Sequence, residues 1–151
     1  MQSFDSPEAI LDFAIASEAE ARDFYNDLAE KVENQNVSDM FKQFADEEQS
    51  HKDKLEDARD SKILVTSPGT VMDLKIADYI VAKEPTPGMG YQEALMLAMN
   101  KEKAAFKLYL DLSEQAGDAN LKTLFLALAQ EEAKHKLRFE IEYDDNVLTE
   151  N

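Results

Sequence analysis

Apolar residues recur along four stretches of this chain at alternating steps of three and four residues, which is the spacing of one face of an α-helix. The pattern predicts four helices, over about 6–33, 37–63, 91–116 and 118–143. We expect their inward faces to carry Leu11, Ala14, Glu18, Ala21, Tyr25, Leu28 and Val32; Val37, Phe41, Phe44, Glu48, His51, Leu55 and Ala58; Leu95, Ala98, Glu102, Ala105, Tyr109 and Leu112; and Leu121, Phe125, Leu128, Glu132, His135 and Phe139.

Short turns join the first helix to the second and the third to the fourth, which favours antiparallel neighbours. The longer stretch 64–89 is rich in proline and glycine, and its centre, 72–82, has a short amphipathic pattern. We interpret it as a crossover that contains a short helix. The sequence therefore predicts an all-α fold, a single domain over 1–151, in which two hairpins, about 6–63 and 90–143, form an antiparallel four-helix bundle.

Ionisable residues interrupt the middle of each inward face. The first and third helices carry one glutamate each and the second and fourth carry a Glu-x-x-His pair: Glu18, Glu102, Glu48 with His51, and Glu132 with His135. These are the only 2 histidines in the chain. A three-residue spacing on a helix puts carboxylate and imidazole on one face, about a turn apart, so that both can reach the same ion.

The two halves of the chain repeat with a constant offset. Adding 84 to Leu11 gives Leu95 and adding 84 to Tyr25 gives Tyr109, and the six ionisable residues match in the same way without a gap. The halves look like copies of one helical hairpin, and neither copy can bury its apolar face alone. We expect them to pack with approximate two-fold symmetry.

The repeat separates these residues from nearby glutamates. Glu20 lies close to Glu18, but its match is Ala104, so Glu18 is the better candidate. Glu30 and Glu114 match each other, yet they lie about 120° around their helices from the inward glutamates, so we expect them to be solvated.

Glu47 and Glu131 are stronger alternatives, because they also match and lie four residues before a histidine. We prefer Glu48 and Glu132, because these continue the apolar rows of their helices.

Four carboxylates and two imidazoles inside an apolar bundle must be protonated, paired or bound to cations. Two divalent ions would balance the four glutamates, with one neutral imidazole for each ion. The chain has no cysteine, which excludes disulfides, zinc-thiolate sites and iron-sulfur clusters. Oxygen and nitrogen ligands suit Fe or Mn better than a structural zinc site. The alternative is that the histidines are hydrogen-bonded core residues and that the glutamates reach the surface.

Two tyrosines that match in the repeat have two interpretations. Aromatic residues with core spacing usually pack and do nothing else. The hydroxyls of Tyr25 and Tyr109 can also bond the ligand carboxylates.

The net charge of −16 argues against binding to nucleic acid or to an anionic membrane, because both depend on basic patches. The first residues lack a basic segment followed by an apolar one, and no run approaches the roughly 18 apolar residues of a membrane span. We expect a soluble, cytoplasmic protein.

The pattern of these residues resembles that of the ferritin-like di-iron carboxylate proteins and, among them, of rubrerythrins, through Glu-x-x-Ala-x-x-x-Tyr at Glu18 to Tyr25 and at Glu102 to Tyr109. The resemblance covers nearly the whole chain except the crossover 64–89 and the C-terminal tail from Tyr143. It implies a ferritin-like bundle that holds two iron ions, for which Mn or Zn can substitute. By this resemblance Glu48 and Glu132 would bridge the metals, Glu18 and Glu102 would be terminal ligands, and His51 and His135 would bind one metal each.

The resemblance also implies an activity, the reduction of peroxide or O2 as in defence against oxidative stress, and a homodimer. Rubrerythrins usually carry a second iron held by four cysteines, which this chain lacks, so the electron donor would be another protein. They commonly have a further glutamate where this chain has Ala105, and the six remaining candidates match a bacterioferritin-type set equally well. A ferroxidase that stores or handles iron, and a non-catalytic bundle stabilised by metal, are therefore the alternatives.

Overall fold

The structure is a computed structural model that describes residues 7–60, 90–116 and 118–145. Over these ranges the chain forms four helices, α1 Pro7–Lys31, α2 Gln35–Asp60, α3 Tyr91–Gln115 and α4 Ala119–Tyr143. The described ranges contain no strand. The predicted crossover 64–89, with its short helix, lies outside the described residues.

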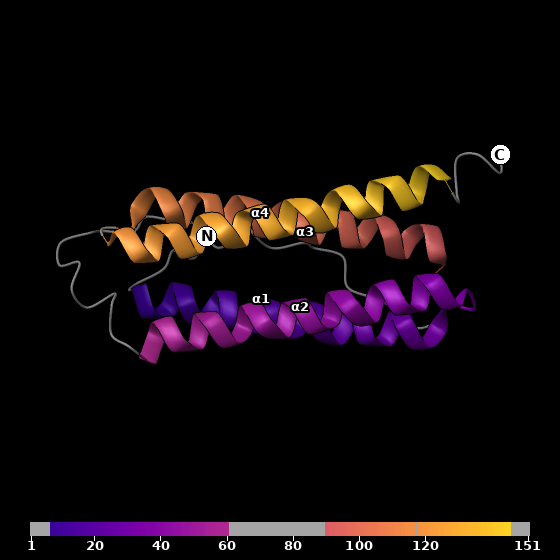
Figure 1. The fold of residues 1–151 in the computed structure, drawn as a ribbon, viewed down its shortest axis with the longest axis horizontal. Coiled ribbons are helices and arrows are strands. Elements are labelled where there is room, and N and C mark those ends of the chain that lie inside the picture. The colour runs from indigo at the N-terminus through magenta and orange to yellow at the C-terminus, as the bar shows by residue number, and fades with distance from the viewer. Residues whose placement is uncertain (1–6, 61–89, 117, 146–151) are drawn as a thin grey trace.

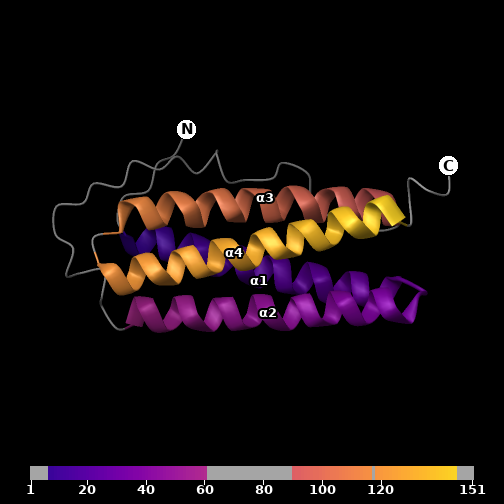
Figure 2. The same ribbon diagram turned by 45° about the horizontal axis from the view of Figure 1, so that its top comes forward.

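The four helices pack as two hairpins in two layers. Figure 1 shows α1 and α2 in one layer and α3 and α4 in the other, with antiparallel partners within each hairpin. Figure 2 shows all four helices lying along one common axis. The colours of Figure 1 show that α2 and α3 run in the same direction. The predicted all-α four-helix bundle is therefore confirmed.

The first interhelical turn lies earlier in the chain than the sequence predicted. Helix α1 ends at Lys31 and α2 begins at Gln35, each two residues earlier than expected. The side-chain oxygen of Asn34 accepts hydrogen bonds from the backbone N–H groups of Asn36, at 2.9 Å, and Val37, at 3.2 Å. Asn34 is thus the cap of α2, so the helix starts directly after it and not after the polar stretch 34–36.

The start of α4 agrees with the sequence. The side chain of Asp118 accepts a hydrogen bond from the backbone N–H of Leu121 at 3.0 Å, which satisfies one of the N–H groups that a helix leaves free in its first turn.

The apolar core consists of two clusters of buried residues. One contains Ile10, Leu11, Ala14, Leu55, Ala58, Leu108, Tyr109, Leu112, Leu121, Phe125, Leu128 and Ala129. The other contains Phe24, Tyr25, Leu28, Ala29, Val37, Met40, Phe41, Phe44, Ala45, Ala94, Leu95, Leu97, Ala98 and Phe139. On every helix the ionisable candidates fall between the members of the two clusters, so they form a polar layer across the middle of the bundle.

The repeat relates the two clusters to each other. Leu11 belongs to one cluster and its match Leu95 to the other, and the same holds for Leu55 and Phe139. Each cluster also draws residues from both hairpins, so neither hairpin can bury its apolar face without the other.

The predicted inward residues are buried with three exceptions. Ala21, Val32 and Ala105 are half-buried, and all the others are buried. Val32 follows the last residue of α1, while Ala21 and Ala105 line a cavity between α1 and α3. No helix of the described part of the chain is long and apolar enough to cross a membrane.

Because the clusters are copies, matched core truncations should have matched costs. Phe41→Ala and Phe125→Ala each remove a fully buried ring, and we expect each to lower the free energy of unfolding by about 3–5 kcal/mol. Urea unfolding followed by circular dichroism gives both values. A cost below about 1 kcal/mol for either variant would contradict equal roles for the two clusters.

Candidate metal centre

All six ionisable side chains predicted at the centre lie together in the polar layer. They come from all four helices, and each is between 1% and 3% exposed: Glu18, Glu48, His51, Glu102, Glu132 and His135. The three-residue spacing keeps each Glu-x-x-His pair on the inward face of α2 or α4, while α1 and α3 supply one glutamate each. The predicted cluster is therefore present in the fold.

The side chains form two groups that share two members. Glu18, Glu48, His51 and Glu132 form one group, with ligand atoms within 4.8 Å of one another, and Glu48, Glu102, Glu132 and His135 form the other. The shared residues are Glu48 and Glu132, the two that the resemblance assigns as bridges. Two cations held by these groups would have these two carboxylates in common.

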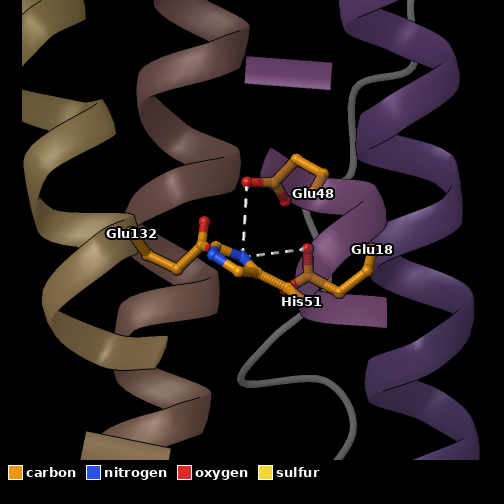
Figure 3. A group of neighbouring side chains, drawn as sticks. All are labelled: Glu18, Glu48, His51 and Glu132. Atoms are coloured by element: carbon orange, nitrogen blue, oxygen red, sulfur yellow. Dashed lines mark hydrogen bonds and ion pairs between the residues drawn. The ribbon is translucent and has the colours of Figure 1, made fainter. Parts of the chain in front are cut away.

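The imidazole of His51 lies among three carboxylates of its group (Figure 3). Its Nδ1 lies 2.9 Å from Glu132 Oε1, 3.6 Å from Glu18 Oε2 and 3.7 Å from Glu48 Oε1. Figure 3 shows that these side chains come from α1, α2 and α4 and converge on the same nitrogen.

His135 has the equivalent arrangement in the other group. Its Nδ1 lies 3.1 Å from Glu48 Oε1 and 3.5 Å from Glu102 Oε1. Both histidines thus present Nδ1 to the cluster, and their rings are roughly parallel, with centroids 6.2 Å apart.

Each tyrosine reaches across to a glutamate of the opposite hairpin. Tyr25 donates a hydrogen bond to Glu102 Oε1, and Tyr109 donates one to Glu18 Oε1. Burial and the nearby carboxylates raise the pKa of both tyrosines well above the usual value, so both hydroxyls keep their protons and act as donors. Of the two interpretations of these residues, the structure supports the hydrogen-bonding one.

The carboxylates of the layer cannot all be charged at once without cations. Burial, together with the charges of Glu18 and Glu102, raises the pKa of Glu48 well above its usual range. Burial and the charges of Glu102 and Glu48 do the same to the pKa of Glu132. Burial also acts to raise the pKa of Glu18, but hydrogen bonds with Glu48 and His51 outweigh it, and its pKa is lowered. Protons on the two shared carboxyls therefore relieve the repulsion.

The donor set fits cations. Among the described residues, four buried side-chain atoms have no hydrogen-bond partner, and all four belong to this cluster: Glu18 Oε2, Glu48 Oε1, Glu102 Oε2 and His135 Nδ1. Buried polar atoms are normally paired, because an unpaired one costs about 1–3 kcal/mol. Ligation of two divalent ions would use these atoms and balance the four carboxylates.

Glu47 has a role that the sequence analysis did not assign. Its Oε2 lies 2.7 Å from Nε2 of His135, the nitrogen that faces away from the cluster. Contacts with Glu102 and Glu47 outweigh the opposing effect of burial and raise the pKa of His135. The ring of His135 also stacks on Phe44, with centroids 4.2 Å apart.

The match of Glu47 behaves differently. Glu131 pairs with Lys134 on its own helix at 3.2 Å, and Leu128 stands where the other half has Phe44. The surroundings of His51 and His135 therefore differ although the six central residues repeat. The repeated position four residues before the histidine was the available signal for Glu47. The spacing along α2 could not show that the partner of Glu47 is His135, which lies in the other hairpin.

The other glutamates lie where the sequence predicted. Glu30 and Glu114 are exposed, and Glu20 is outside the cluster, where it pairs with Lys101 at 3.3 Å.

Comparisons with known proteins agree with the fold and show the family. A protein-family model, Rubrerythrin, matches residues 9–70 and 93–151. A hypothetical protein from Pyrococcus furiosus is similar in structure, with 28% identity, a TM-score of 0.71, and coverage of 93% of this chain and 89% of that one. A protein from Thermotoga maritima that is described as ferritin-like and diiron-carboxylate has 22% identity and a TM-score of 0.80, over 97% of this chain and 99% of that one. Among curated proteins, none matches.

Removing the charge of a shared glutamate should stabilise the metal-free protein at high pH. The pKa of Glu48 in the folded state lies above its ordinary value of 4.5, so its contribution to stability is complete below about pH 4.5 and is lost as the pH rises through the raised pKa. Glutamine carries no charge and loses nothing. We expect Glu48→Gln, in chelator, to raise the free energy of unfolding at pH 8 by about 1–2 kcal/mol, or roughly 2–8 °C in Tm, with little effect at pH 4.5.

Thermal unfolding at both pH values measures this effect, and Glu30→Gln, at an exposed position, is the matched control. An equal pH dependence in Glu48→Gln and in the unaltered protein would contradict the raised pKa.

Loss of the Glu47 charge should weaken one of two metal-binding steps. Residues that orient a ligand histidine typically contribute 10- to 100-fold to metal affinity, so we expect Glu47→Gln to weaken one step of a Co(II) titration by about tenfold or more. Isothermal titration calorimetry of the metal-free protein resolves the steps. Glu131→Gln is the matched control and should leave both steps within about twofold of the original, because Glu131 bonds Lys134 and neither histidine. Equal effects of the two variants would show that the asymmetry has no consequence for binding.

Proposed function

This chain belongs to the rubrerythrin family, and from that premise we propose that it is a non-haem di-iron oxidoreductase that reduces hydrogen peroxide or O2. The observation that carries the proposal is the buried pair of ligand groups with two shared glutamates. We also propose that it acts in the cytoplasm and takes its electrons from another protein.

The two groups suggest how the ions would be held. Glu18 and His51 would bind one ion, Glu102 and His135 would bind the other, and the shared carboxylates would bind both. Oxygen and nitrogen donors without thiolate favour Fe or Mn over a structural zinc site. A pair of Fe(II) ions supplies the two electrons that convert one hydrogen peroxide and two protons into two waters.

The protein's own residues hold this centre in place and shield it at both ends of the bundle. Tyr25 and Tyr109 each fix one oxygen of a terminal glutamate, so the other oxygen is left for a cation. The apolar clusters on both sides of the layer exclude water, which strengthens every electrostatic interaction inside. The rigid helices set the distance between the two groups.

The electron donor would be a separate protein. Thiolate-bound iron centres need cysteine, and the sequence has 0. Helix α4 exposes Leu126, Leu137 and Ile141 on one side, and these exposed apolar side chains support our proposal of a homodimer.

Iron oxidation for storage is the second candidate, because the six central residues also suit a ferroxidase. Storage needs a cage of many subunits, whereas the proposed oxidoreductase works as a small particle. Sedimentation velocity distinguishes the two, since a cage-sized species would favour storage and a dimer-sized one would exclude it.

The direct test is anaerobic loading with Fe(II), followed by rapid mixing with hydrogen peroxide or with O2. We expect oxidation of the bound Fe(II), followed by absorbance, to be at least about tenfold faster than that of free Fe(II) in the same buffer, and Glu48→Ala to remove most of this difference because it deletes a shared ligand. Glu30→Ala, at an exposed position, should leave the rate unchanged. A rate that does not exceed the free-iron rate would refute the proposed reaction.

A further inference from the structure

A cavity of about 120 Å³ lies between α1 and α3 and reaches the metal centre. All four central glutamates line it, and neither central histidine does. The cavity therefore approaches the layer from the side of its carboxylates, where ions held by the two groups would face open space. At about 30 Å³ for each water, it has room for about four water molecules.

Small side chains make this space. Ala21 and Ala105, which match in the repeat, both line the cavity and are half-buried although they belong to the predicted inward faces. A larger residue at either position would fill the passage between the surface and the glutamates.

The mouth of the cavity is where the repeat breaks down. Lys101 Nζ lies 3.3 Å from Glu20 Oε1, and both residues line the cavity. Their matches are Ser17 and Ala104, two small residues that line the same cavity. The ion pair thus stands on one side of the approximate two-fold axis only, and it joins α1 to α3.

Exposure places this pair at the outer end. The Glu20 side chain is 53% exposed and the Lys101 side chain 15% exposed, while the glutamates at the inner end are almost completely buried. The Lys101 ammonium also lies 5.9 Å from the centroid of the Phe24 ring, so a second contact restrains it over the opening.

We propose that this cavity is the entry port through which small uncharged oxidants reach the metal centre, and that the Lys101–Glu20 pair closes its mouth to larger molecules. The inference rests on the proposed function and names its substrate class, which is hydrogen peroxide or O2 and not bulky organic hydroperoxides. The four glutamates at the inner end of the cavity disfavour the entry of anions. The volume admits a molecule the size of about two waters but no aromatic ring together with its substituents.

A second groove, between α2 and α4, is the competing route. It is lined by His135, Glu47, Glu131 and Lys134, and none of the central glutamates lines it. Its inner wall is the edge of an imidazole whose outward nitrogen already contacts Glu47. A molecule in this groove would meet a histidine and not the carboxylate side of the layer.

The absence of cysteine allows a direct test of access that needs no metal. Ala105→Cys and Ala21→Cys each place a single thiol in the cavity, and Gln43→Cys places one at an exposed position in the α2–α4 groove. Each variant is treated with iodoacetamide and with an uncharged pyrenyl iodoacetamide, and intact mass gives both alkylation rates. The ratio of the two rates at one thiol cancels the reactivity of that thiol and leaves its access.

We expect both cavity thiols to react with iodoacetamide, and the pyrenyl-to-small rate ratio to be at least about tenfold lower in the cavity than at Gln43→Cys. The role of the Lys101–Glu20 pair is tested by adding Lys101→Ala to each cavity variant. We expect this change to raise the pyrenyl-to-small rate ratio about fivefold or more, because the side chain over the mouth is gone. Lys134→Ala removes a comparable ion pair, with Glu131 at 3.2 Å, on the opposite face and should leave the ratio unchanged.

Three outcomes would overturn the proposal. Cavity thiols that resist iodoacetamide would show that there is no port, and a ratio equal to that of Gln43→Cys would show no size limit. Equal effects of Lys101→Ala and Lys134→Ala would show that the Lys101–Glu20 pair does not control access to the cavity. None of these measurements uses iron, so they are distinct from a failure of the proposed reaction, which only the Fe(II) experiment reports.

Discussion

Four carboxylates buried side by side in an apolar bundle repel one another, and several features of this structure reduce that repulsion. The pKa values of Glu48 and Glu132 are raised, so that without cations protons neutralise these two carboxylates. Tyr25 and Tyr109 respond with hydrogen bonds that cross from one hairpin to the other. The same polar layer divides the apolar core into two clusters. The metal-free bundle therefore carries an energetic cost at its centre, as functional sites commonly do, and bound cations would relieve it.

The two halves of the chain match closely in the polar layer and differ in the residues around it. The six central residues, the two tyrosines and most residues of the core clusters have partners 84 positions away. Outside this layer Glu47 contacts a histidine while its match does not, and Lys101 pairs with Glu20 where the other half has two small residues. The symmetric centre would suit two equal ions, while the breaks in the repeat give the two ligand groups and the two faces of the layer different surroundings.

Periodicity and the repeat were enough to predict the bundle, the inward faces and the six central residues, because a helix converts sequence spacing directly into a shared face. The start of α2 was placed two residues late, because the side chain of Asn34 ends the turn early. Glu47 was set aside in favour of Glu48, because its partner lies on another helix and spacing along one helix carries no record of that contact. The cavity beside Ala105 was also out of reach, since a gap depends on what faces it across the bundle.

The sharing of each core cluster between the hairpins has a consequence for what two copies of one hairpin could form. One hairpin holds a glutamate, a Glu-x-x-His pair, a tyrosine and part of each apolar cluster, so two identical copies would complete the whole layer between them. Such a pair of identical hairpins would hold two indistinguishable ions, and the same residues would stand on both sides of the mouth of the cavity. In a single polypeptide each position can differ from its twin, as Lys101 and Glu20 do from Ser17 and Ala104, and as Phe44 beside His135 does from Leu128.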